Sequence, residues 1–385
     1  MFYALCMVSI LNTQALPDHK GIRPDDFNGV IGHEARGRGA QTNQSGRFEP
    51  HQYARIDDGW HGLEDLPTLQ THVTEETTRK IITTNSSPDI GFDQSINPYR
   101  GCEHGCTYCF ARPTHAYMGL SPGLDFESKL FAKTNASTSL RRELSSPKYR
   151  PKTIALGTNT DPYQPIERER RIMRSILQVL AEFRHPVAIV TKSALVTRDI
   201  DILAPMAAQG LVKVAISLTT LDGKLARSME PRAATPQRRL RTISTLAKAG
   251  IPTTAMVAPI IPALNDAEIE NLLKAAFQAG AQGAAYVLLR LPLEVRDVFH
   301  EWLKATYPDR ADHVFSLIRS MRDGKDYDAT WGKRMRGTGP YAWSIGRRFE
   351  LTCQRLGLNK NPASLTTDLF VRPSTPDPQL SLFEF

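Results

Sequence analysis

Short apolar segments alternate with amphipathic helical segments between residues 95 and 300, and this alternation limits the folds open to the chain more than any other feature. Strand, helix and strand repeated at this interval imply parallel strands joined by right-handed crossovers. The apolar segments that predict strands cover residues 153–157, 187–191, 212–218, 253–258 and 285–289. We therefore expect an α/β protein with a mainly parallel sheet.

The helices expected between these strands cover residues 168–183, 198–209, 237–249 and 266–279. Three of them end near Gly210, Gly250 and Gly280, and glycine commonly caps the C-terminus of a helix. With the segment before Cys102, the pattern gives about six βα units, fewer than the eight of a closed barrel. A partial (β/α)6 barrel over residues 91–300 fits best, and a doubly wound sheet is the alternative. In either fold, ligands bind beyond the carboxyl ends of the strands.

The flanking regions have other patterns. Residues 1–90 are polar and rich in turn-forming residues, which predicts an extended, partly disordered arm with one strand over residues 78–84. Residues 301–385 predict a helical C-terminal extension and tail. The apolar residues 1–11 lack the basic region and cleavage site of a signal peptide, so we expect a frayed tail or a misassigned start codon in a cytoplasmic protein. No apolar run approaches the ~20 residues that span a bilayer.

The charge of the chain gives weak guidance on partners. The net charge is +8, but the basic residues are spread along the sequence. One C-terminal region interleaves cations with aromatic residues, as nucleic-acid grooves do. Its members are Lys333, Arg334, Arg336, Arg347, Arg348, Trp331, Tyr341 and Trp343. Of the two interpretations, a helix and loop that cap the barrel is favoured, and a nucleic-acid groove is the alternative.

Three of the five cysteines fall within eight residues, at Cys102, Cys106 and Cys109, with the spacing C-x3-C-x2-C. Cys6 and Cys353 are isolated. An odd count with one tight group argues against a disulfide framework and for metal chemistry in a reducing compartment.

Thiolates are soft ligands that suit iron–sulfur clusters and zinc. A four-iron cluster normally takes four cysteines, so three would leave one iron without a protein ligand and open to chemistry. The alternative is a zinc knuckle with His104 or His115 as the fourth ligand, in a non-catalytic nucleic-acid-binding protein. Zinc sites usually pair two ligand hooks, and no second hook follows here. We expect both histidines to be polar neighbours of the site and not ligands.

Polar residues follow the predicted strands where a barrel mouth would lie. Thr158, Asn159 and Asp161 follow the strand at 153–157, and the last two offer acceptors for an ammonium group. An Asx turn is the alternative interpretation of this stretch. Lys192 and Ser217 end the next two strands, and small-residue packing is the alternative for Ser217.

Glu230, Arg232 and Pro259 are further residues expected near this mouth. Glu230 and Arg232 follow the Ser217 strand, as a structural ion pair or as part of the site lining. Pro259 cannot continue a central strand, so it predicts a loop over the pocket.

The sequence GCEHGCTYCF at residues 101–110, with Tyr108 before the last cysteine, resembles the signature of the radical S-adenosylmethionine (SAM) superfamily. The resemblance implies a [4Fe-4S] cluster on the three cysteines, with its open iron chelating SAM. Electron transfer to SAM would yield a 5′-deoxyadenosyl radical that abstracts hydrogen from a substrate. It also implies a reductase, flavodoxin or ferredoxin as electron donor.

More narrowly, the chain resembles the spore photoproduct lyase-like branch and an uncharacterised bacterial subgroup of these proteins. The supporting stretches are NPYRGC (97–102), GTNTDPYQP (157–165), TKS (191–193), MEPR (229–232), GRGA (37–40) and the region around MRG (335–337). The resemblance implies that SAM is bound by Tyr108, Thr158, Asn159, Asp161, Lys192 and Ser217.

This sequence departs from the lyase at one position that matters. The lyase carries a further cysteine near the strand before its SAM-binding loop, where this chain has Gly157 and Thr158. Repair of thymine dimers does not follow, and the substrate stays unassigned, with nucleic acid among the candidates.

Overall fold

The computed structural model describes residues 37–48 and 69–373. The apolar segment 1–11, Cys6 and most of the predicted N-terminal arm lie outside these residues. No helix of the described residues is long and apolar enough to cross a membrane.

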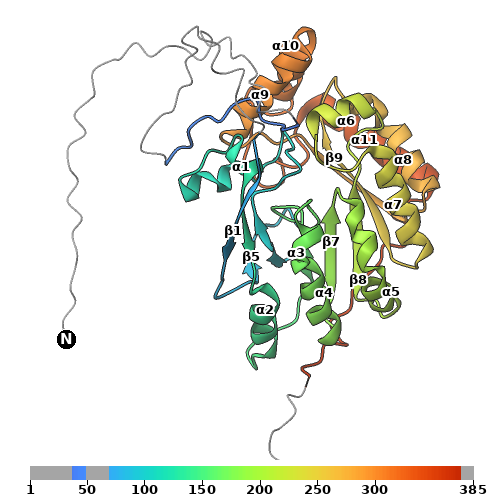
Figure 1. Ribbon diagram of the computed structural model, residues 1–385. Coiled ribbons are helices and arrows are strands. Elements are labelled where there is room, and N and C mark those ends of the chain that lie inside the picture. Colours follow the sequence, from blue (N-terminus) through green and yellow to red (C-terminus); the bar gives the residue numbers. More distant parts are fainter. Residues whose placement is uncertain (1–36, 49–68, 374–385) are drawn as a thin grey trace, which may run out of the picture.

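Six parallel strands form the main sheet (Figure 1). They are β3 (Gln94–Ile96), β6 (Ile154–Leu156), β7 (Val187–Thr191), β8 (Val212–Ser217), β9 (Thr253–Ile260) and β10 (Gly283–Leu288). A short strand, β2 (Thr83–Thr84), pairs antiparallel with β3 at one edge. The six strands lie side by side in chain order. A doubly wound sheet would reverse its strand order, so this topology confirms the partial (β/α)6 barrel.

The burial pattern of the strands shows which face is packed. In β7 the burial alternates, with Val187, Ile189 and Thr191 buried and the residues between them half-buried. β8, β9 and β10 alternate in the same way. The fully buried positions join the main core with residues of the helices, whereas the other face of the sheet stays partly accessible. This differs from a closed barrel, whose interior is filled by side chains.

Helices follow the strands as the periodicity predicts. They are α4 (Ile172–Glu182), α5 (Ile200–Ala208), α7 (Pro236–Lys248) and α8 (Ile269–Gln278), and the shorter α6 (Gly223–Met229) follows β8 directly. The predicted helix over 168–183 is interrupted by Arg171, whose φ of 51° separates α3 (Glu167–Arg170) from α4. Similarly, 3-10 turns at Ala194–Asp199 and Asp266–Glu268 precede α5 and α8. Gly210, Gly250 and Gly280 have φ values of 69°, 74° and 102°, as expected of helix C-caps.

Two local predictions were wrong. β9 continues through Pro259 to Ile260, where a loop was expected. The β9–β10 register shifts between Tyr286 and Leu288, and such an irregularity accommodates a proline inside a sheet. Only Thr83 and Thr84 of the predicted strand 78–84 are in a strand.

A second, three-stranded sheet lies beside the first parallel strand and has no counterpart in the prediction. It consists of β1 (His72–Glu76), β5 (Lys129–Lys133) and β4 (Tyr99–Arg100). Its neighbours are the short helix α1 (Asp125–Ser128) and α2 (Ala136–Ser145) (Figure 1). Residues 72–76, which belong to the predicted N-terminal arm, are therefore a paired strand of this small sheet.

The C-terminal region is helical, with α9 (Val295–Thr306), α10 (Pro308–Ser320) and α11 (Gly339–Leu356). Figure 1 shows α9 and α10 beyond one end of the main sheet and α11 beside α8. The segment before α11 joins the two edges of the partial barrel. The Leu288 amide of β10 donates to the Met335 carbonyl (2.9 Å), while Arg334 forms an ion pair with Asp89, between β2 and β3.

Candidate functional site

The cysteine loop, residues 101–110, follows β4 and carries the three clustered cysteines. Its turns depend on Gly101 and Gly105, whose φ values of 74° and 65° favour glycine. The Cys102 amide donates to the Phe126 carbonyl (2.9 Å), and the Cys109 amide donates to the Cys106 carbonyl (3.2 Å). The bond from Cys109 closes a turn within the loop, and the bond from Cys102 joins the loop to α1.

Segments that follow four other parallel strands contact this loop. After β6, Gln164 donates to the Gly101 carbonyl (3.1 Å) and accepts from the Glu103 amide (2.9 Å). After β8, the Met229 carbonyl accepts from the Thr107 amide (3.0 Å). Residues after β9 and β10 share an apolar cluster with Cys106 and Tyr108; they include Ile261, Leu289 and Leu291. The loop therefore lies at the carboxyl ends of the strands, where ligands of such folds bind.

All three thiols are free, and they are close enough to influence one another's ionisation. Burial raises the pKa of Cys106 to about 12, and it raises the pKa values of Cys102 and Cys109 as well. Thr107, between the last two cysteines, has a buried hydroxyl without a hydrogen-bond partner. In the described part of the chain, no three or more Cys, His, Asp or Glu side chains are grouped as ligands of a single metal ion.

Tyr108 belongs to a buried polar network centred on Glu230, whose role the sequence did not decide. Its hydroxyl donates to Glu230, which also accepts from the Thr219 hydroxyl (2.8 Å) and forms an ion pair with Arg239 of α7. Burial disfavours the charged carboxylate, but the cations Arg239 and Lys192 outweigh burial and hold the pKa of Glu230 at about 2. Glu230 is thus an ionised anchor beneath the cysteine loop.

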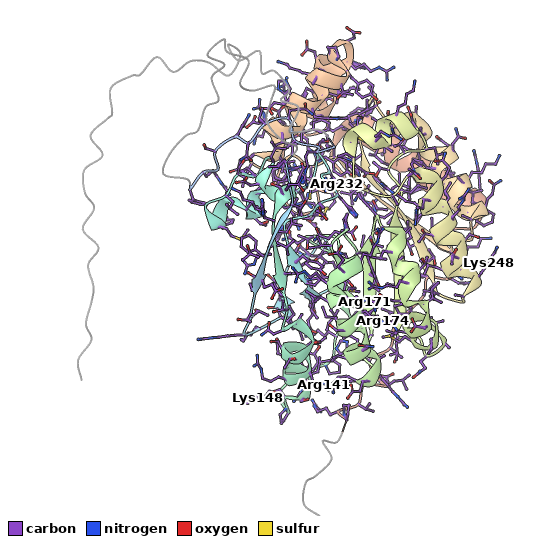
Figure 2. The ribbon with its side chains drawn as sticks, viewed as in Figure 1. Arg141, Lys148, Arg171, Arg174, Arg232 and Lys248 are labelled. Atoms are coloured by element: carbon purple, nitrogen blue, oxygen red, sulfur yellow. The ribbon has the colours of Figure 1, made fainter. Side chains whose placement is uncertain are left out.

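Arg232 forms a different contact from its neighbour Glu230. Its guanidinium lies 2.8 Å from Glu103 of the cysteine loop, and its amide donates to the His104 carbonyl (3.3 Å). Figure 2 shows Arg232 in the upper half of the view, below the C-terminal helices α9 and α10 of Figure 1. Arg232 and Glu230 therefore do not pair with each other. Each belongs to its own ion pair, with Glu103 and Arg239 respectively, and both pairs support the cysteine loop.

Both carboxylate oxygens of Asp161 accept hydrogen bonds from other residues of the protein. Its carboxylate accepts from the Tyr163 amide (2.9 Å), the Thr191 hydroxyl (2.6 Å) and the Lys192 amide (2.7 Å), and Nδ1 of His104 lies 3.3 Å away. The first of these contacts is the Asx turn considered above. His104 and the backbone donors outweigh burial and lower the pKa of Asp161 to about 2. Asp161 joins the ends of β6 and β7 to the cysteine loop.

The other predicted SAM contacts differ in how free their side chains are. Asn97 accepts from the Asn159 amide (3.0 Å) and lies within 3.4 Å of the Thr158 hydroxyl. The side chain of Asn159 has no hydrogen bond to any residue that the structure describes. The Ser217 hydroxyl is buried and donates to the Ala258 carbonyl (3.3 Å). Asn159 is thus the more available of these polar groups.

Lys192 is the cation with the strongest influence on the Cys106 thiol. Its ammonium lies 5.8 Å from the centre of the Tyr108 ring. Burial opposes its charge, but the neighbouring Cys106 and Glu230 raise the pKa of Lys192. The structure thus groups Tyr108, Lys192 and the cysteine loop, with Asn159 and Asp161 on the segment after β6.

A second buried ion pair beside the loop has no signal in the sequence. Arg112 and Glu127 are both fully buried and form an ion pair with each other. Arg112 also donates to the Cys106 carbonyl (3.0 Å) and to two carbonyls of the turn before α1. A single arginine or glutamate in a polar stretch carries no sequence signal of this kind, because charged residues are usually exposed.

Comparisons with known proteins agree with this geometry. The family model of the radical SAM superfamily matches residues 96–276. An uncharacterised protein of Mycobacterium tuberculosis is 41% identical over 232 residues, which cover 60% of this chain and 68% of that protein. An uncharacterised protein of Methanocaldococcus jannaschii is 30% identical over 173 residues, which cover 45% of this chain and 62% of that protein.

Among solved structures, the chain is similar in fold to spore photoproduct lyase. A complex of that enzyme with dinucleoside spore photoproduct has a TM-score of 0.54 and 15% identity, covering 74% of this chain and 80% of that chain. A mutant of the enzyme with bound AdoMet and the same dinucleoside has a TM-score of 0.53, with the same identity and coverage. This likeness is one of fold, and it agrees with the predicted partial barrel.

Proposed function

Because the chain belongs to the radical SAM superfamily, we propose that it is an enzyme holding a [4Fe-4S] cluster and SAM at the mouth of its partial barrel. The observation that carries the proposal is the cysteine loop itself. It presents three free thiols, close enough to influence one another's ionisation, at the carboxyl ends of the parallel strands. Three soft ligands suit an iron–sulfur cluster that keeps one iron for a small-molecule ligand.

A bound and reduced cluster would supply the electron for reductive cleavage of SAM, and through it the chemistry of hydrogen abstraction from a substrate. Cys102, Cys106 and Cys109 would hold the cluster. The unpartnered Thr107 hydroxyl is consistent with a group that fills the space beside the loop, because a buried polar group without a partner costs free energy.

The residues around the loop have complementary roles in this proposal. Lys192 offers a cation for a carboxylate, and Asn159 offers an acceptor for an ammonium group. Tyr108 stays protonated, because burial and Glu230 raise its pKa well above the ordinary value. Thr158, Ser217 and Asp161 would line or position this pocket, with Asp161 acting through its bonds to Lys192 and Thr191.

The substrate is left open, with nucleic acid among the candidates. Gly157 has φ of 83°, and a Cβ built there would lie 2.0 Å from the Val190 carbonyl oxygen. No side chain fits at this position, so a hydrogen-donating cysteine at 157 is excluded. This supports a reaction other than that of spore photoproduct lyase. We further propose that a reductase, flavodoxin or ferredoxin supplies the electron.

Anaerobic reconstitution with iron and sulfide tests the proposal. We expect about four irons per chain and, with dithionite and SAM, formation of 5′-deoxyadenosine. Cys106→Ala should lose the brown colour, the iron and the product. Cys353→Ala is the matched control, because Cys353 is also a buried cysteine but lies in α11.

Three results would contradict the proposal. Zinc in place of iron would favour the non-catalytic alternative. Iron without cleavage of SAM would remove the enzymatic role. Equal iron content in the Cys106 and Cys353 variants would separate the metal from the cysteine loop.

A further inference from the structure

We propose that residues 37–40 of the N-terminal region, here called the strap, are a positioning element of the metal site. They fix the cysteine loop from outside the barrel. The inference rests on the proposed function, since it assigns part of the arm to retention of the proposed cluster. Neither the family match at 96–276 nor the spacing of the cysteines includes these residues.

The strap contacts the loop where a side chain cannot be accommodated. A Cβ built on Gly39 would lie 1.7 Å from the carbonyl oxygen of Gly105 and 3.3 Å from Cγ2 of Thr107. Gly105 lies between Cys102 and Cys106, and its φ of 65° also favours glycine. Two glycine backbones therefore meet directly at the turn that separates two of the three thiols.

A buried carboxylate then connects the strap to the backbone of Cys106. Glu127 accepts from the amides of Gly39 (2.9 Å) and Ala40 (2.8 Å). Its other partner is Arg112, which donates to the Cys106 carbonyl (3.0 Å). Both charged side chains are fully buried, so neither can exchange these partners for water.

Arg38 ties the strap to the opposite end of the loop. Its guanidinium donates to the Glu127 carbonyl (2.7 Å) and to the Thr71 hydroxyl (2.9 Å). Thr71 in turn donates to Glu103 (2.6 Å), the residue after Cys102 and the partner of Arg232. The chain of contacts therefore reaches the side chain of Glu103, next to Cys102, as well as the backbone of Cys106.

These contacts matter because three protein ligands must be held in place for a cluster to persist. Residues that orient metal ligands commonly change metal affinity by about 10- to 100-fold when they are altered. The strap and its partners orient the backbone of the cysteine loop without touching the thiols. Loss of the strap contact should therefore release iron while the barrel stays folded.

The test compares Gly39→Ala with Gly91→Ala in the full chain. Nothing lies within 4 Å of a Cβ built on Gly91, and its φ is not in the left-handed region, so this variant controls for the added methyl group. We expect Gly39→Ala to lose iron to a chelator about tenfold faster than wild type. Its reduced cluster should also give an altered electron paramagnetic resonance spectrum. The Gly91 variant should match wild type in both readouts. The metal-free Gly39 variant should still unfold in one cooperative thermal transition, which shows that the barrel stays folded.

Thr71→Val is the second variant, because it removes one hydroxyl from the connection without adding bulk. We expect it to release iron at a rate between those of wild type and Gly39→Ala. Wild-type iron retention and spectra in both variants would overturn the strap proposal alone. The same holds if Gly39→Ala fails to fold and Thr71→Val retains iron normally. If wild type itself binds no iron, the proposed function falls and takes the strap proposal with it.

Discussion

Glu230 shows how much depends on a single buried charge in this protein. It has no exposed surface and is held between the hydroxyls of Tyr108 and Thr219 and the guanidinium of Arg239. The motif MEPR did not decide between an ion pair and a site residue, because that choice depends on α7, which supplies Arg239. In the structure, Glu230 supports the aromatic residue of the cysteine loop.

We expect Glu230→Gln to destabilise the protein by about 3–5 kcal/mol, because it leaves the Arg239 guanidinium buried without its counter-charge. Urea unfolding monitored by circular dichroism measures the change. Glu182→Gln is the control, since Glu182 pairs with Arg141 at the surface, where both side chains are at least 40% exposed. That variant should change stability by about 1 kcal/mol or less. Equal effects of the two substitutions would contradict the anchoring role of Glu230.

Gly157 is the second position where one residue decides a local structure. Its φ of 83° and its approach to Val190 allow the segment after β6 to turn toward Asp161. Gly157→Ala should cost at least about 2 kcal/mol, because it adds both a clash and a strained backbone. Thermal unfolding would show this as a lowered melting temperature. Gly223→Ala, with open space around its Cβ, should be nearly neutral; a similar loss there would refute the clash.

At the scale of elements, His185 joins three parts of the chain at the end of the sheet opposite the site. Its Nε2 lies 2.7 Å from the Tyr149 hydroxyl, its Nδ1 lies 3.0 Å from the Pro186 carbonyl oxygen, and its ring packs against Phe370. It follows α4 and precedes β7. The neutral ring therefore joins the turn between α4 and β7 to the segment before β6 and to the C-terminal segment.

Burial lowers the pKa of His185 from 6.5 to about 4. The folded state therefore takes up its proton at lower pH than the unfolded state, so stability is lost as pH falls from 6.5 toward 4. The loss should reach about 3 kcal/mol, because each pKa unit corresponds to about 1.4 kcal/mol. Urea unfolding at several pH values should show this slope in wild type. In His185→Gln the slope should be shallower by that amount, and an unchanged slope would rule out His185 as its source.

At the scale of the whole molecule, the C-terminal region completes the partial barrel. Arg334 pairs with Asp89, Arg348 pairs with Glu270, and Arg336 lies over the ring of Tyr286 at 4.2 Å from its centre. These three arginines of the C-terminal region thus have partners within the protein, which is what a segment that caps the barrel needs. Trp331 and Trp343 are exposed, at 59% and 70% of their surface.

We expect Arg334→Ala to loosen the two edges that this segment joins. Hydrogen exchange should become severalfold faster in β2, β3 and β10, because the ion pair to Asp89 and the hydrogen bond to Ser87 are lost. Lys333→Ala is the neighbouring control, since Lys333 pairs locally with Asp323 at the surface. Unchanged hydrogen exchange at both edges in Arg334→Ala would show that the contacts of Arg334 with Asp89 and Ser87 do not stabilise these strands.

The βα series, the three-cysteine motif and the superfamily could all be predicted from the amino-acid sequence. Each of these depends on residues close together in the chain, such as the run 187–191 or Cys102, Cys106 and Cys109, whose periodicity or spacing can be read directly. The strand order then confirmed the partial barrel.

Only the tertiary structure decided which charged residues build the site. Glu127 accepts from amides 87 and 88 residues away, and Arg239 reaches Glu230 from another helix. Gly39 belonged to a segment with no periodicity, yet its backbone meets that of Gly105. The physical reason is that a buried charge or a close backbone approach is defined by its partners. Those partners are brought together by packing across the whole chain, and the local sequence carries no trace of them.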